Sequence, residues 1–275
     1  MTDLSTLFSY TFMQHALLAC ILASIGCGVI GTYVVVKRIG FLAGGIAHSV
    51  LAGMGIAYFM GASPLLGATL AALVAGILIG WINLHWRQDE DILIAAFWSV
   101  GMATGVIFIS RTEGYKIDLM SYLFGNILLV PHRDLYLMLA LDIVILVLVF
   151  LFYRQFLAAA FDEEFSRLRG INVEFYYILL LCMVALTVVL LIQVVGLILV
   201  LALLVLPAAS AAQFVNTIKR MMLLAVIFSV IITASGLVIS FEPDLPSGST
   251  IIIVAGLFYI MSIITRGLVR YFRTA

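Results

Sequence analysis

The segment Arg154-Gln-Phe-Leu-Ala-Ala-Ala-Phe-Asp-Glu-Glu-Phe-Ser-Arg-Leu-Arg-Gly170 is the longest charged stretch of the chain, and long apolar runs precede and follow it. These runs are continuous rather than alternating, which is typical of helices that cross a bilayer and not of membrane barrels. Of the 275 residues, 65% are hydrophobic and 10% are charged, more apolar surface than a soluble domain of this size could bury. The sequence therefore predicts an all-α, polytopic membrane protein with a single transmembrane domain over residues 1–275.

Four apolar residues of the charged segment recur at helical spacing: Leu157, Phe161, Phe165 and Leu168. Charged side chains cover the remaining faces, and Gly170 is a natural helix stop. We therefore expect an amphipathic helix over about residues 155–170, between two membrane spans. Such a helix offers a surface to a partner in water, which suggests a transport subunit driven by a separate soluble protein.

Nine apolar segments reach or approach the length that a helix needs to cross a bilayer. They cover about residues 11–36, 41–60, 64–86, 91–110, 133–153, 174–193, 195–214, 220–240 and 249–268. The second segment is short and rich in glycine, so eight full crossings plus one partial crossing is the alternative.

The distribution of Lys and Arg predicts the orientation, because the cytoplasmic loops of membrane proteins are rich in these residues. With the 154–173 loop in the cytoplasm, alternating spans leave 11 of the 14 Lys and Arg residues on that side. The other three, Arg111, Lys116 and Arg133, lie outside. We expect the N-terminus outside and the C-terminus in the cytoplasm.

Several functional classes are excluded by features that the sequence lacks. The net charge is zero, which leaves no basic face for a nucleic acid. Cys20, Cys27 and Cys182 lie in apolar runs without disulfide or zinc spacing, so we interpret them as buried apolar side chains. The pattern Gly26-Cys-Gly28-Val-Ile-Gly31 matches a dinucleotide fingerprint but lies within an apolar span, where it predicts helix packing. No P-loop or catalytic motif occurs, so we expect no enzyme activity, and any ATP is hydrolysed by another chain.

Five stretches, taken together and in this order, carry a resemblance to a known family. They are Lys37-Arg-Ile-Gly-Phe-Leu-Ala-Gly-Gly-Ile-Ala-His-Ser-Val-Leu-Ala-Gly53, Ile117-Asp-Leu-Met-Ser-Tyr-Leu-Phe-Gly-Asn126, Phe161-Asp-Glu-Glu-Phe-Ser-Arg-Leu-Arg-Gly170, Val195-Gly-Leu-Ile-Leu-Val-Leu-Ala-Leu-Leu-Val-Leu-Pro-Ala-Ala209 and Asp244-Leu-Pro-Ser-Gly248. The chain resembles the membrane-spanning permeases of bacterial ATP-binding-cassette (ABC) importers for zinc and manganese. The resemblance runs over nearly the whole chain.

This resemblance implies a type II importer-like fold in the bacterial inner membrane and a homodimer with a central pathway. It implies two ATPase subunits on the cytoplasmic side and an extracytoplasmic metal-binding protein that delivers the ion. The transported substrate would be a divalent metal ion, with no permanently bound cofactor; the stretch 118–125 looks closest to zinc importers, which favours zinc slightly over manganese or iron. The charged segment matches the coupling helix of the family, and its implied coupling residues are Phe161, Asp162, Glu163, Glu164, Phe165, Arg167 and Gly170.

Two intramembrane residues are candidates for the transport pathway, because ionisable groups within a span tend to face cavities or partners. Family members commonly carry an aspartate four residues before His48, where this chain has Gly44. His48 is either a transient metal ligand, with space beside it at Gly44, Gly45 and Gly53, or a neutral packing residue. Asp142, deep in the fifth span, could supply the missing carboxylate or be a hydrogen-bonded packing residue.

Two other functional classes compete with the importer. A transporter driven by an ion gradient should show an inverted repeat and several acids at the membrane midplane, and the sequence has one such acid. A membrane-embedded enzyme would need convergent catalytic groups at one depth, for which His48 and Asp142 are the only candidate pair.

Overall fold

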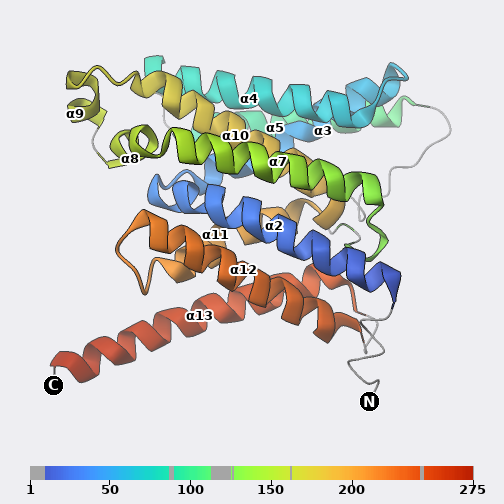
Figure 1. The fold of residues 1–275 in the computed structure, drawn as a ribbon. Helices are drawn as coiled ribbons and strands as arrows, with labels where there is room; N and C mark the ends of the chain where they lie inside the picture. Colours follow the sequence, from blue (N-terminus) through green and yellow to red (C-terminus); the bar gives the residue numbers. More distant parts are fainter. Residues whose placement is uncertain are drawn as a thin grey trace. The chain divides into compact units, whose positions relative to one another are not determined.

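The computed structural model describes residues 10–86, 90–112, 125, 127–161, 163–241 and 245–274, and in this part of the chain every regular element is a helix (Figure 1). In chain order they are α2 (Thr11–Val36), α3 (Gly40–Phe59), α4 (Pro64–Trp86), α5 (Glu90–Ser110), the 3-10 turn η1 (Ile127–Leu129), α7 (His132–Leu151), α8 (Tyr153–Phe161), α9 (Glu163–Leu168), α10 (Val173–Val195), α11 (Leu197–Ala211), α12 (Ile218–Phe241) and α13 (Ser247–Thr274). The all-α membrane fold predicted from composition is confirmed.

Eight of the described helices are long and apolar enough to span a membrane, and the ninth apolar helix, α11, is shorter at 15 residues. By length and composition the structure thus has eight candidate spans and a shorter ninth helix, and the expectation that the second segment is the short one was wrong. The helix α3 runs for 20 residues in spite of its glycines. The short helix arises instead because Gly196, with φ 81°, ends α10 and redirects the chain into α11.

The chain divides into two compact units, each built from several separate ranges. The first unit combines residues 1–35, 120–144 and 191–275, and the second combines residues 36–119 and 145–190. The single transmembrane domain over residues 1–275 stays a prediction.

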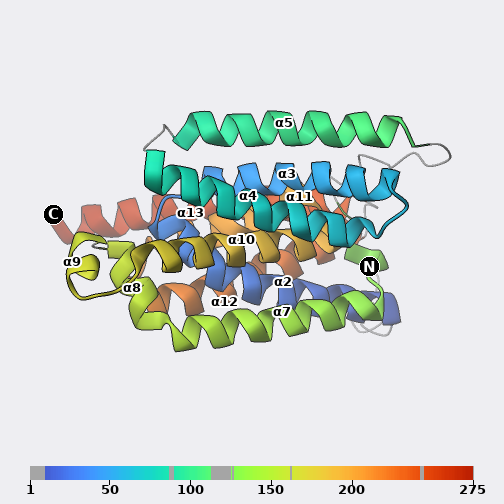
Figure 2. The ribbon, with the colours of Figure 1, turned by 90° about the horizontal axis from the view of Figure 1, so that it is seen from above.

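In the second unit, α3 packs between α4 and α5 through residues that have almost no side chain (Figure 2). A Cβ atom at Gly53 would collide with the Gly67 carbonyl of α4, and one at Gly55 would lie 2.6 Å from the Gly105 carbonyl of α5. On α5, a Cβ atom at Gly101 would lie 2.7 Å from the Ser49 Cα atom. Helices in a bilayer gain little from hydrophobic association, so close backbone contact is what stabilises this packing.

In the first unit, glycines of α2 contact α11 and α12 in the same way. A Cβ atom at Gly28 would lie 2.6 Å from the Val226 side chain, and one at Gly31 would collide with the Leu204 carbonyl. The hydroxyl groups of Ser24 and Thr233 add a buried hydrogen bond of 3.3 Å between α2 and α12. The interpretation of the Gly26–Gly31 pattern as helix packing is confirmed.

Candidate functional site

His48 lies on α3 in the second unit, and its side chain is only 8% exposed. Its ring stacks on the Trp98 indole of α5 with 3.8 Å between ring centroids and 12° between the ring planes. The indole N–H of Trp98 in turn donates to the Met102 Sδ atom at 3.2 Å, which fixes the orientation of the indole. A stacked imidazole keeps its two nitrogen atoms at the ring edge, where they can still bind a proton or a metal ion.

The space beside His48 is at Gly44, one helical turn earlier on the same helix. A Cβ atom at Gly44 would meet no atom of the described residues within 4 Å, whereas one at Gly45 would lie 3.1 Å from the Ile94 side chain. At Gly53 the backbone of α4 fills the space completely. Of the three glycines expected to leave room near the imidazole, only Gly44 does so, because the other two serve helix packing. Gly44 is also the position at which the resemblance to metal permeases implies an aspartate.

Asp142 lies on α7 within the first unit, with 5% of its surface exposed. Its Oδ2 atom is buried and has no hydrogen-bond partner among the described residues. A buried carboxylate oxygen of this kind is costly unless a proton or a cation compensates it. His48 and Asp142 belong to different compact units, so their pairing stays a prediction.

Among the residues that the structure describes, neither His48 nor Asp142 belongs to a preassembled metal cluster. Within the described ranges, no group of three or more His, Cys, Asp or Glu side chains is placed to hold a metal ion. A single imidazole binds a dication weakly, because tight zinc sites use four ligands and manganese or calcium sites use more oxygen ligands. A site formed by one imidazole alone would therefore give brief contact with an ion, not retention.

Two of the five motif stretches meet in the first unit. Gly125, from the stretch 117–126, has a φ of 65°, and a Cβ atom there would collide with the Val195–Gly196 peptide. That peptide is the break between α10 and α11 in the stretch 195–209. Only a glycine combines a positive φ with so close a backbone approach, which gives Gly125 and Gly196 a structural role.

The charged segment forms two short helices rather than the single amphipathic helix that its periodicity predicts. α8 ends at Phe161 and α9 begins at Glu163; Asp162 and the side chain of Glu163 lie outside the described residues. α8 buries Phe156 and Ala159, and α9 buries Ser166, so the buried face is not the predicted apolar stripe. The prediction of one continuous helix over 155–170 was therefore wrong. The predicted apolar stripe also does not face inward along its length.

The apolar residues of that predicted stripe point mostly to the outside of the chain. Phe161 is 70% exposed, Phe165 50% and Leu168 86%. Arg169 lies over the Phe165 ring at 4.7 Å, and Glu164 is exposed beside it. Large apolar side chains in a polar loop, left uncovered by their own chain, indicate a surface that another molecule covers.

The end of the segment is built to hold this surface in place. Gly170, with φ 76°, ends α9, and the Ile171 N–H donates to the Ser166 carbonyl at 3.0 Å. The Asn172 side chain then accepts from the Phe175 N–H at 3.0 Å and caps the start of α10. Arg167 and Glu174 both line a pocket of about 280 Å³, and their side chains approach to 3.8 Å. Because this ion pair is exposed, it contributes little to the free energy of folding.

Comparison with known proteins gives the family. The sequence profile of the ABC 3 transport family matches residues 9–266, and the chain belongs to this family. A membrane protein of Synechocystis is 43% identical over 94% of this chain and 92% of its own length. The manganese transport system membrane protein MntC of Halalkalibacterium halodurans is 35% identical over 93% of this chain and 88% of its own length. The solved structure of PsaBC from Streptococcus pneumoniae in complex with Fab has a TM-score of 0.84 and 31% identity, covering 94% of this chain and 93% of that chain.

The family predicted from five motif stretches is therefore confirmed. One residue of the candidate site was missed by sequence analysis, namely Trp98, which covers His48. The sequence places His48 and Trp98 on the second and fourth predicted segments but carries no signal that their faces meet, so no pattern in the chain could have paired them.

Proposed function

We propose that the chain is the membrane-spanning subunit of an ATP-driven importer for divalent metal ions. The observation that carries this proposal is the family match over nearly the full chain, together with relatives of more than 30% identity whose names specify metal or manganese transport. The working unit is a homodimer with separate ATPase subunits and an extracytoplasmic protein that delivers the ion. The chain itself carries no ATPase and no permanent cofactor.

The transported ion is a divalent transition metal. Manganese is supported by the names of relatives at 30–35% identity, and zinc by the resemblance of the stretch 118–125 to zinc importers. The two ions differ in their preferred ligands, because manganese favours oxygen-rich sites and zinc accepts imidazole readily. Competition of each metal, including iron, against uptake of radioactive manganese and zinc in proteoliposomes decides between them.

We propose that His48 contacts the passing ion, with the space at Gly44 available for water or the ion itself. Asp142 is proposed as a second polar group of the pathway, because its buried oxygen atom has no hydrogen-bond partner in the described part of the chain. Weak binding suits transport, since an ion held at the strength of a structural site would not be released.

We propose that the α8–α9 segment is the surface on which the ATPase acts. Its support is the exposure of Phe161, Phe165 and Leu168 on a firmly capped turn. Closure of the ATPases on ATP would move this segment and the spans attached to it, and so switch the pathway between its two sides. With this segment on the cytoplasmic side of the inner membrane, the N-terminus lies outside and the C-terminus lies in the cytoplasm.

The test is purification of the tagged full-length chain from its native host in mild detergent. An ATPase with a P-loop in equal amount, lost in the double variant Phe161→Asp/Phe165→Asp, is the expected result. The control is Met60→Asp, which places the same charge on an apolar side chain that is 75% exposed at the end of α3. A folded chain that transports metal without an ATPase, driven by an ion gradient, would instead support the gradient-driven alternative. None of the relatives reported above supports that alternative.

A further inference from the structure

Two histidine side chains from separate helices touch in the first unit. His15 lies in the second turn of α2, and His132 is the first residue of α7. Their imidazole rings meet edge to face, with 4.0 Å between the ring centroids and 68° between the ring planes. The chain has four histidines, so this contact brings half of them together from positions far apart in the sequence.

The two rings differ in their freedom to move. His15 is half-buried, and its neighbour Ala16 is fully buried, whereas His132 is exposed. The backbone around His132 is nevertheless fixed, because the Asp134 N–H donates to the Pro131 carbonyl at 3.0 Å where α7 begins. The pair therefore combines one held imidazole with one that can turn about its side-chain bonds.

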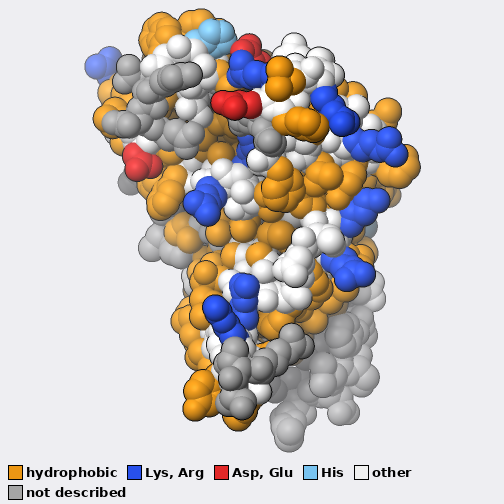
Figure 3. Space-filling model, turned by 90° about the vertical axis from the view of Figure 1, so that its left-hand side faces the viewer, with side chains coloured by type: hydrophobic (Ala, Val, Ile, Leu, Met, Phe, Trp, Pro, Cys, Tyr) orange, Lys and Arg blue, Asp and Glu red, His pale blue; other side chains and the backbone are white. Residues whose placement is uncertain are grey.

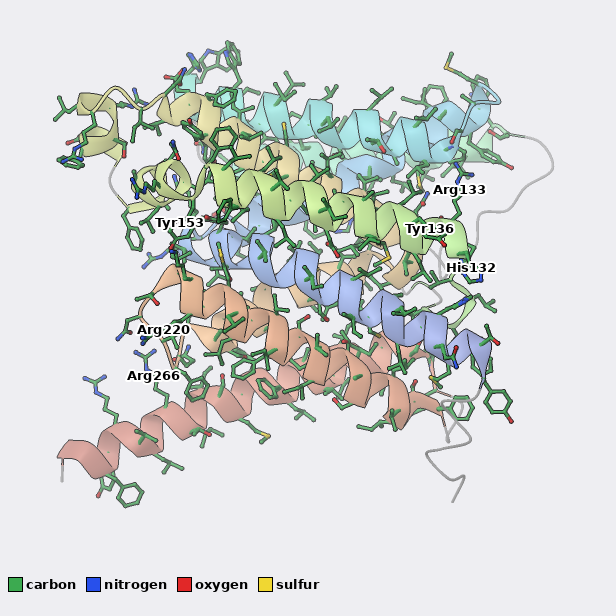
Figure 4. All side chains as sticks on the ribbon, in the orientation of Figure 1. His132, Arg133, Tyr136, Tyr153, Arg220 and Arg266 are labelled. Carbon is green, nitrogen blue, oxygen red and sulfur yellow. The ribbon has the colours of Figure 1, made fainter. Side chains whose placement is uncertain are left out.

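The charges next to the pair do not strongly oppose a cation. Arg133 and Asp134, which follow His132, cancel in formal charge, and Figure 4 shows His132 and Arg133 pointing to different sides of the first turn of α7. The lower part of Figure 3 shows the other end of this unit's helices, where Lys and Arg side chains gather and would repel a dication. The starts of α2 and α7 carry a partial positive charge, which makes a cation site here weaker than a structural zinc site.

Two imidazoles from different helices suit a transition metal ion. Zinc binds neutral imidazole at about 2.0–2.1 Å in a tetrahedral arrangement, so two such nitrogen atoms lie about 3.4 Å apart and their ring centroids about 5 Å apart. The rings of His15 and His132 are already at 4.0 Å, edge to face. A turn of the exposed His132 side chain supplies the remaining separation of about 1 Å and brings a nitrogen atom of each ring toward one ion.

We infer that His15 and His132 form a binding site for one zinc ion, or a similar imidazole-binding metal ion, that links the start of α2 to the start of α7. No third His, Cys, Asp or Glu side chain among the described residues completes a cluster with them, so water fills the other positions. Manganese favours oxygen ligands and should bind here much more weakly. The site shares no residue with the proposed pathway, and it does not depend on the transported ion or on the ATPase.

The experiment measures zinc binding to the full-length chain, purified with a tag that contains no histidine. Calorimetry should show zinc affinity at least tenfold weaker in His132→Asn and in His15→Asn, since even loss of a hydrogen-bond partner of a metal ligand costs ten- to a hundredfold. The matched control is His85→Asn, which removes an exposed imidazole from α4. It should bind zinc like the unaltered chain, and manganese binding should change in none of the three variants.

A spectroscopic measurement on the unaltered chain protects the test against a misfolded variant. Copper(II) binds such ligands more tightly than zinc, and in substoichiometric amount its electron paramagnetic resonance spectrum should show splitting by two nitrogen donors. Splitting by one nitrogen, or by none, would overturn the inference. So would equal zinc affinity in His132→Asn and His85→Asn, or loss of the zinc site in His48→Asn, which would assign the ion to the proposed pathway.

Discussion

Gly44 and Gly53 lie on the same helix, yet their surroundings are opposite. At Gly53 a single methyl group would collide with the Gly67 carbonyl and approach the Ala71 Cβ atom to 2.5 Å. At Gly44 the same methyl group would meet no atom within 4 Å in the part of the chain that the structure describes. The first glycine allows α3 and α4 to touch along their backbones, while the second leaves unfilled space next to an imidazole.

The difference shows that glycine content alone does not report function in a membrane helix. Close packing is the main source of helix association in lipid, so small residues on α3 are expected to be filled against a neighbour. A glycine that is buried but faces open space is the exception, and here it stands one turn from His48. The comparison thus separates the part of α3 that packs against α4 from the part where space remains one turn from His48.

The largest expected effect is that of Gly53→Ala. The added Cβ atom must separate α3 from α4, and overpacking of this kind costs about 1–3 kcal/mol. We expect a lower melting temperature in detergent and less monodisperse protein. Gly67→Ala should behave alike, because the two glycines contact each other. Full stability in both variants would contradict the packing described for this pair of helices.

The second effect concerns metal affinity. Gly44→Asp places a carboxylate one turn from His48, and two ligands at this spacing can share one dication. We expect manganese or zinc to bind the purified variant roughly tenfold more tightly than the unaltered chain, measured by calorimetry, with slower release during transport. Gly44→Asn is the matched control of equal shape, and equal affinity in both variants would show that the carboxylate does not reach the ion.

A smaller effect is expected from Trp98→Leu, because Trp98 positions His48 and is itself 39% exposed. Loss of the stack frees the imidazole to rotate, so we expect the KM for metal uptake to rise about threefold at a nearly constant melting temperature. Trp98→Phe preserves a stacking ring and should restore most of the change. A fall in stability without a change in KM would assign Trp98 to packing alone.

The smallest effect is that of Gly44→Ala. The methyl group has space, and alanine favours the helix over glycine by about 1 kcal/mol, so stability should stay the same or rise slightly. The matched comparison with Gly53→Ala, in thermal unfolding under identical detergent conditions, tests the opening contrast directly. A destabilisation as large as that of Gly53→Ala would mean that the space at Gly44 is filled in the folded protein.

Much of the fold follows from the sequence because continuous apolar runs leave few alternatives to membrane helices. The break at Gly196 was not predicted, since the apolar run continues through it and only the contact with Gly125 reveals the positive φ. The division of the charged segment into α8 and α9 was missed for a related reason. Periodicity reports spacing along the chain, whereas Phe156 and Ala159 are buried by tertiary contacts.

The candidate site was predicted in its residues but not in its surroundings. His48 and Asp142 stand out in a sequence because charged or polar groups are rare in apolar runs. The open space at Gly44 and the indole of Trp98 depend on how α3 meets α5, which spacing along the chain does not encode.

The exposed phenylalanines of the α8–α9 segment also have a consequence for the synthesis of the protein. A newly made copy without a partner on this segment would display Phe161, Phe165 and Leu168 to water, and uncovered apolar surface of this kind promotes aggregation and proteolysis. If the proposed ATPase covers the segment, the amount of this subunit that survives in a cell should follow the supply of that ATPase. Balanced production of the two chains would then be a condition for the lifetime of the subunit as well as for transport.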